Sequence, residues 1–183
     1  PDLDPSEPWV RNFRRASGIW HGFDTGVPAD NQLISPPIQL ATTGPFTLSI
    51  KHRYDFEQSM MQNFDGGVIE ISDDDGKTWT DLGMMMKMGG YSGTIETNPR
   101  NPLSARSAFI GRSPSYGDAA KPGYTTTLIE LSDTYKGKAI RLLAAVRERY
   151  PSLRYLLDGD GDVVQEAAGG TPRWSSRRVA AAV

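Results

Sequence analysis

The segment from residue 65 to residue 81 constrains the fold of this chain more than any other part of the sequence. Val68, Ile69 and Ile71 form a β-branched run, and such runs favour strands. Residues 72–76 are rich in turn-forming types, and residues 78–80 return to types that are common in strands. The sequence therefore predicts a β-hairpin with its turn at residues 72–76.

The turn fits the Asp-box pattern Ser-X-Asp-X-Gly-X-Thr-Trp, with Ser72, Asp74, Gly76, Thr78 and Trp79 at its fixed positions. In this pattern the Asp carboxylate accepts backbone N–H bonds, the Gly supplies a positive φ, and the indole covers the turn with apolar area. These roles are structural, so the motif does not indicate catalysis. Asp-boxes mark the blades of propellers in secreted sialidases, where several copies occur, and a single copy predicts no propeller here.

Composition and charge narrow the remaining possibilities. At 183 residues the chain suits one domain, and its 19 Gly and 13 Pro favour a turn-rich all-β protein over a helical one. A net charge of -2 gives no broad attraction for phosphate backbones, which predicts no nucleic-acid partner. No apolar run approaches the roughly twenty residues that cross a bilayer, so no membrane span is expected.

Periodicity locates the core face and leaves one segment ambiguous. Residues 46–57 place large apolar groups and His52 on alternate positions, which predicts a strand whose buried face carries them. His52 on that face is read as a hydrogen-bonded core histidine. Residues 138–150 fit either a buried strand or a short helix near 141–150. Together with the long loops, the strand spacing predicts an antiparallel β-sandwich with one decorated end.

An ordered series of motifs resembles a known family. The series is Asp30–Pro36, His52–Glu57, Asp65–Ser72, Tyr91–Ile95, Asn101–Leu103, Arg106–Phe109, Leu131 and Gly137. Over about residues 20–141 the chain resembles the MAM-like jelly-roll accessory domains of secreted bacterial metallopeptidases of the fungalysin and immune inhibitor A types. The last forty residues depart from that pattern. We therefore expect an N-terminal arm over 1–19, a jelly-roll sandwich over 20–147, and a divergent or poorly ordered tail over 148–183.

The resemblance implies a calcium ion held by oxygen ligands at the strand ends. Asp30, Glu57 and Asp65 match the family motifs and are the expected ligands, with Asp24 and Asp158 as lesser options. Two structural alternatives stay open. In the first, Asp30 caps a turn and binds no ion. In the second, Glu57 pairs with Arg53 or Arg106 and binds no ion.

The function implied is that of a secreted, non-catalytic binding module attached to a peptidase domain of the same parent chain. The start at Pro1, without a leader, is consistent with a segment of a longer protein. Tyr91, Tyr116 and Tyr124 are the expected contacts for a protein or glycan ligand, with ordinary surface tyrosines as the alternative. A carbohydrate-binding module of a secreted enzyme is a further alternative.

An enzyme is the least favoured reading of the sequence. His21 and His52 are the only histidines, there is no Cys, and no Gly-X-Ser-X-Gly elbow presents a serine. These absences predict no catalytic residues in this chain. A free-standing hydrolase with a carboxylate site stays an alternative, because Asp and Glu are plentiful.

Overall fold

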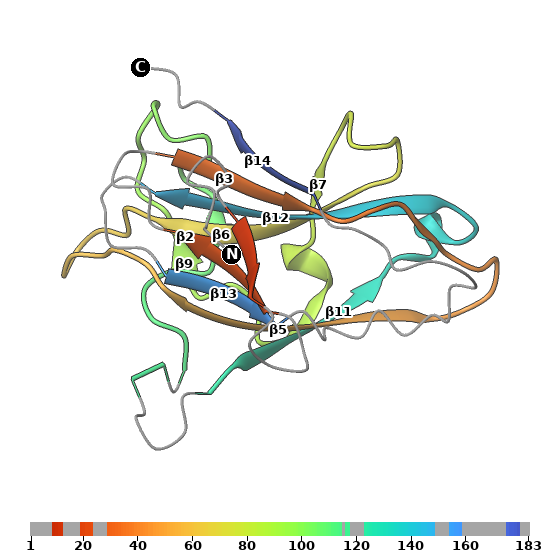
Figure 1. The fold of residues 1–183 in the computed structure, drawn as a ribbon, viewed down its shortest axis with the longest axis horizontal. Helices are drawn as coiled ribbons and strands as arrows, with labels where there is room; N and C mark the ends of the chain where they lie inside the picture. Colours follow the sequence, from red (N-terminus) through yellow and green to blue (C-terminus); the bar gives the residue numbers. More distant parts are fainter. Residues whose placement is uncertain are drawn as a thin grey trace.

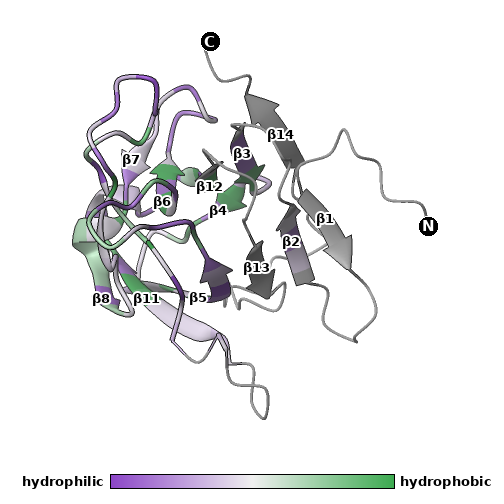
Figure 2. Ribbon diagram, turned by 90° about the vertical axis from the view of Figure 1, so that its left-hand side faces the viewer, coloured by the Kyte–Doolittle hydropathy of each residue, from purple (hydrophilic) through white to green (hydrophobic). Residues whose placement is uncertain are grey.

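The computed structural model describes residues 9–12, 19–23, 29–114, 116–117, 123–148, 154–158 and 175–179, and side chains within 20–22, 30–114, 116–117 and 123–146. In this part of the chain the strands pair antiparallel and form two layers (Figures 1 and 2). This arrangement confirms the predicted all-β sandwich with long loops. Within the described residues, no helix has the length and apolarity that crossing a bilayer demands.

The two layers are sheet 1 and sheet 2. The order of strands in sheet 1 is β1 (Trp9–Asn12), β2 (Ile19–Phe23), β13 (Arg154–Asp158), β5 (Phe46–Asp55), β11 (Thr125–Leu131) and β8 (Met86–Met88). The order in sheet 2 is β14 (Ser175–Val179), β3 (Ala29–Ile34), β12 (Ala139–Glu148), β6 (Gly66–Ser72) and β7 (Thr80–Asp81), with β4 (Ile38–Gln39) beside β12. The remaining elements are a short hairpin of β9 (Gly93–Thr94) and β10 (Ser107–Ala108) and the 3₁₀ turns η1 (Gly83–Met85) and η2 (Asp133–Tyr135).

The main core lies between the two sheets. The alternate residues of β5 point into it, as predicted, with Leu48, His52, Tyr54 and Phe56 buried. They meet the inward residues of sheet 2, of which Ile69 is 2% exposed. Alternation along a pleated strand therefore sets which face of β5 is apolar.

A second, smaller core covers the outer face of sheet 2. Its buried residues are Val68, Ile95, Leu103, Ala108, Leu143 and Ala145. They join β6 and β12 to the long segment 91–113, so that β6 is buried on both faces. A Cβ at Gly66 would lie 2.8 Å from the carbonyl oxygen of Phe109, and this close approach explains the glycine.

The ambiguous segment is a strand. β12 runs from Ala139 to Glu148 between β3 and β6, so the alternative of a short helix near 141–150 is wrong. One face of β12 packs in the main core, through Leu142, and the other face packs in the second core, through Leu143. A strand buried on both faces loses the simple alternation of polar and apolar residues, which is why the pattern also fitted a helix.

The ends of the chain contribute strands to both sheets. β13 lies between β2 and β5 in sheet 1, and β14 pairs with β3 at the edge of sheet 2. β1 pairs with β2 at the other end of sheet 1. The division of the chain into arm, sandwich and tail stays a prediction.

Candidate functional site

The three predicted calcium ligands come from segments that meet at one end of the sandwich. Asp30 on β3 lies opposite Arg147 of β12, which in turn lies opposite Gly66 at the start of β6. Asp65 directly precedes that glycine. Glu57 follows the end of β5, and its carbonyl oxygen accepts the Asp65 amide at 3.4 Å. The sandwich topology therefore brings residues 30, 57 and 65 toward the same edge.

Burial at this end is unusually high for acidic groups. Asp65 is fully buried and Asp30 is 8% exposed, with its Oδ2 accepting a hydrogen bond from Gln32 Nε2 at 3.2 Å. Glu57 is half-buried, and its Oε2 is buried without a hydrogen-bond partner among the described residues. Asn31 is also fully buried, but it follows Asp30 on β3, so its side chain points to the opposite face of sheet 2.

These carboxylates do not by themselves complete a metal site. Among the described residues, no three His, Cys, Asp or Glu side chains come together as a metal-binding group. Calcium takes six to eight oxygens, and amide and backbone carbonyl oxygens commonly supply part of them. The residues present thus fit a calcium site only in part, with the buried Oε2 of Glu57 as the observation in its favour.

One of the two structural alternatives for the acidic residues, the pairing of Glu57 with Arg53 or Arg106, is wrong. Asp30 is the second residue of strand β3, and a turn-capping role for it stays a prediction. Arg106 binds Glu70 at 2.6 Å and Asp81 at 2.5 Å, and Glu57 has neither Arg53 nor Arg106 as a partner. Asp24 and the side chain of Asp158 lie outside the described part of the chain.

The three predicted ligand-binding tyrosines occupy different environments. The Tyr91 hydroxyl accepts from the Ile69 amide at 3.0 Å and donates to the Ile69 carbonyl at 3.3 Å, and its ring meets Phe109 edge-on. Burial raises the pKa of Tyr91, so this tyrosine is built into the core packing. Tyr116 and Tyr124 are half-buried. Contact of these tyrosines with a ligand stays a prediction.

The Asp-box forms as its pattern predicts. Asp74 Oδ1 accepts from the amides of Lys77 at 3.1 Å and Thr78 at 2.9 Å, while Oδ2 accepts from the Thr78 hydroxyl at 2.7 Å. The Thr78 amide and hydroxyl, with the Ser72 hydroxyl, hold the pKa of Asp74 well below its usual range. Gly76 has φ +87°, and the turn packs against Trp79.

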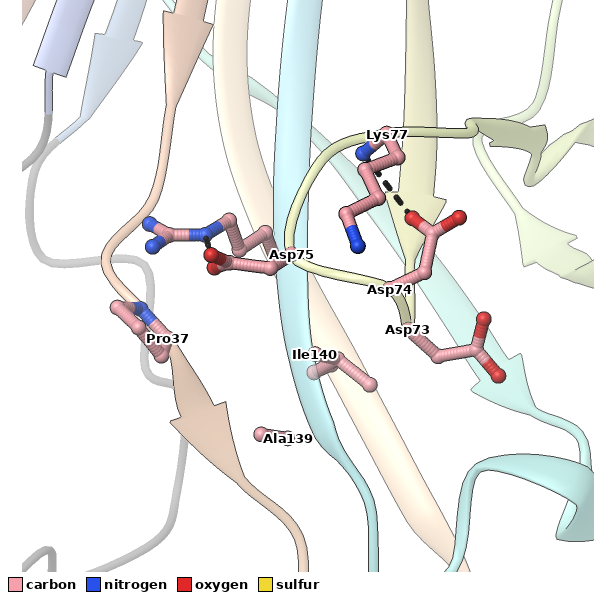
Figure 3. Close-up of a pocket in the computed structure, with 8 residues that line it drawn as sticks. Pro37, Asp73, Asp74, Asp75, Lys77, Ala139 and Ile140 are labelled. Atoms are coloured by element: carbon pink, nitrogen blue, oxygen red, sulfur yellow. Dashed lines mark hydrogen bonds and ion pairs between the residues drawn. The ribbon is translucent and has the colours of Figure 1, made fainter.

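A cavity of about 510 Å³ lies beside this turn (Figure 3). Pro37, Ala139 and Ile140 give it an apolar wall. Asp73 is paired with Lys138, which directly precedes β12, and Asp75 is paired with Arg141 of β12, each at 2.6 Å. These pairs fasten the turn to the sheet and leave its carboxylates engaged.

The histidine on the apolar face is a core residue, as predicted. His52 is fully buried, with its Nε2 2.8 Å from Thr127 Oγ1. Since that hydroxyl donates to the Gly89 carbonyl at 2.5 Å, it accepts from His52, which places the imidazole proton on Nε2. Burial lowers the pKa of His52 to about 4.

The outward face of β5 carries a cluster that the sequence analysis missed. The Arg53 guanidinium lies 4.1 Å from the centre of the Tyr116 ring, and Arg112 lies 5.5 Å from it. Arg112 also binds Asp55 Oδ2 through Nε and Nη2. Strand alternation puts residues 53 and 55 on one face, but only the fold adds residues 112 and 116.

Comparison of the sequence with protein-family models and with curated proteins gives no match.

Proposed function

We propose that this chain is a non-catalytic accessory module of a secreted multidomain peptidase, stabilised by calcium, which attaches its parent to a substrate or a surface. The ordered motifs between residues 30 and 137 support the family, and the all-β sandwich is compatible with it. Hydrolysis by the peptidase domain of the parent chain would supply the chemistry. A carboxylate hydrolase in this chain stays an untested alternative.

The buried Oε2 of Glu57 carries the calcium part of the proposal. An anionic oxygen that is removed from water without a partner is unfavourable by several kcal/mol unless a cation or donor compensates it. The backbone carbonyl of the same residue, Glu57, accepts the amide of fully buried Asp65. A calcium ion at this end would compensate the charge of Glu57. Glu57 and Asp65 would hold it, with Asp30 at the same end of the sandwich.

Thermal unfolding with and without calcium tests this part. An ion that binds only the folded state at one hundred times its Kd adds about 2.7 kcal/mol, which raises Tm by several degrees in a chain of this length. Glu57→Gln keeps the shape of the side chain and should abolish the difference between millimolar calcium and chelator. Glu130→Gln changes an exposed carboxylate on β11 of sheet 1 and should keep it. Equal midpoints for the unsubstituted chain would remove calcium from the proposal.

Binding assays test the attachment part. We expect the chain to be retained by immobilised denatured protein or by a glycan surface, and to cleave neither. Retention by no such surface would refute attachment, and turnover by the purified chain would refute the non-catalytic assignment.

A carbohydrate-binding module is the second candidate. Tyr116, half exposed beside two arginines on the outside of sheet 1, is the observation that favours it. Retention on glycans but not on denatured protein would select this candidate.

A further inference from the structure

Two arginines and a carboxylate form a cluster around Tyr116 on the outside of sheet 1. Arg53 and Arg112 both lie against Tyr116, and Asp55 is paired with Arg112. Both bonds of Arg112 go to Asp55 Oδ2, at 3.1 Å from Nε and 2.8 Å from Nη2. Within the described residues Arg53 forms no ion pair, so one guanidinium of this cluster lacks an anion.

The bonding of Arg53 is also incomplete. Its Nη2 donates to the Tyr116 carbonyl at 2.6 Å, while its Nε is buried and has no hydrogen-bond acceptor among the described residues. A buried donor on a cation is unfavourable when it is unpaired, and such groups are rare in folded proteins. An incoming carboxylate would offset the charge of this half-buried guanidinium, as Asp55 does for Arg112.

The neighbouring strand positions extend this charge along the sheet. Lys51 is exposed two residues before Arg53, so it projects from the same face about 7 Å away along the strand. A single exposed pair contributes little to affinity, because water and salt screen it. A polymer with repeated carboxylates can engage Lys51, Arg53 and Arg112 together, which favours a polyanion over a free ion.

The position of β5 favours a glycan over a peptide. β5 lies between β13 and β11, and its backbone groups are used in pairing with both. An extended peptide gains much of its affinity by adding a strand at a free edge, which an interior strand does not offer. An acidic glycan presents its carboxylates and hydroxyls at its periphery, where side chains on a sheet face can reach them.

We propose that the outward face of β5, centred on Arg53 with Arg112 and Lys51, binds the carboxylates of a uronic-acid glycan. This inference rests on the proposed attachment function and names its ligand class. Tyr116 acts as the support that holds the two guanidinium groups together.

Calorimetric titration of the whole chain with oligogalacturonate at low salt, in chelator, tests the inference. We expect binding that weakens as salt rises, about tenfold weaker binding in Arg53→Gln, and about threefold weaker binding in Arg112→Gln. Lys87→Gln removes an equal charge at the edge of sheet 1 and should bind normally. Arg112 is 61% exposed, so its variant should fold even if the Arg53 variant does not.

Three outcomes would overturn the inference. One is unchanged affinity in Arg112→Gln, and another is equally tight binding of poly-L-glutamate, which would indicate an acidic peptide ligand. The third is retention on denatured protein or neutral glycan with no oligogalacturonate binding, which would leave the attachment function standing. Binding to none of these probes would refute the attachment function as well.

Discussion

Acid should destabilise this protein through one buried imidazole. His52 is fully buried, donates from Nε2 to Thr127 Oγ1, and has a pKa of about 4 because burial disfavours its charged form. In the unfolded chain its pKa returns to about 6.5. Between these two values the unfolded state binds a proton that the folded state excludes, so stability falls as pH falls.

The magnitude follows from the difference between the two pKa values. A difference of about 2.5 units corresponds to about 3 kcal/mol, of which about 2 kcal/mol is lost between pH 7.5 and pH 5. This window lies above the range in which ordinary carboxylates titrate. The contribution of His52 is complete above pH 6.5 and is lost progressively as pH falls toward 4.

Urea unfolding at pH 7.5, 6.5, 5.5 and 5 measures this dependence. The unsubstituted chain should lose about 2 kcal/mol across the series. His52→Gln should be less stable at pH 7.5 and should lose much less as pH falls. His21→Gln removes the other histidine and should keep the dependence on His52.

Two results would refute the reasoning. The first is an unchanged pH dependence in His52→Gln. The second is an NMR titration in which the His52 ring of the folded chain protonates near pH 6.5, and this measurement decides the question even if the variant does not fold.

Three further substitutions probe the local architecture. Gly89→Ala should destabilise the chain by about 1–3 kcal/mol in urea unfolding, because the φ of Gly89 is +60° and the new Cβ would lie against the Thr126 carbonyl. Gly90→Ala is the control: its Cβ meets only ordinary contacts, so its effect on stability should be much smaller. Tyr91→Phe should cost about 1–2 kcal/mol by removing the hydroxyl between the Ile69 amide and carbonyl, and a neutral result would contradict the structural role of this tyrosine. Asp74→Ala should lower Tm and speed amide exchange at residues 77 and 78, whereas unchanged exchange there would show that the carboxylate does not hold the turn.

The sequence alone was sufficient for features whose partners are close along the chain. The Asp-box turn depends on bonds that span at most four residues, such as Ser72 with Gly76 and Asp74 with Thr78, so its pattern predicted its geometry. Alternation along β5 likewise predicted that His52 faces the core. A pleated strand puts every second side chain on the same face whatever the strand packs against.

Tertiary structure decided everything that depends on distant partners. Residues 139–148 form a strand because β3 and β6 flank them, and their apolar pattern also fitted a helix. Pairing of Glu57 with Arg53 or Arg106 was the alternative to a calcium site, yet Arg106 binds Glu70 and Asp81 instead. Arg53 meets Tyr116 across 63 positions of the chain. Strand order sets such pairings, and it depends on how the whole chain buries its apolar faces rather than on any local pattern.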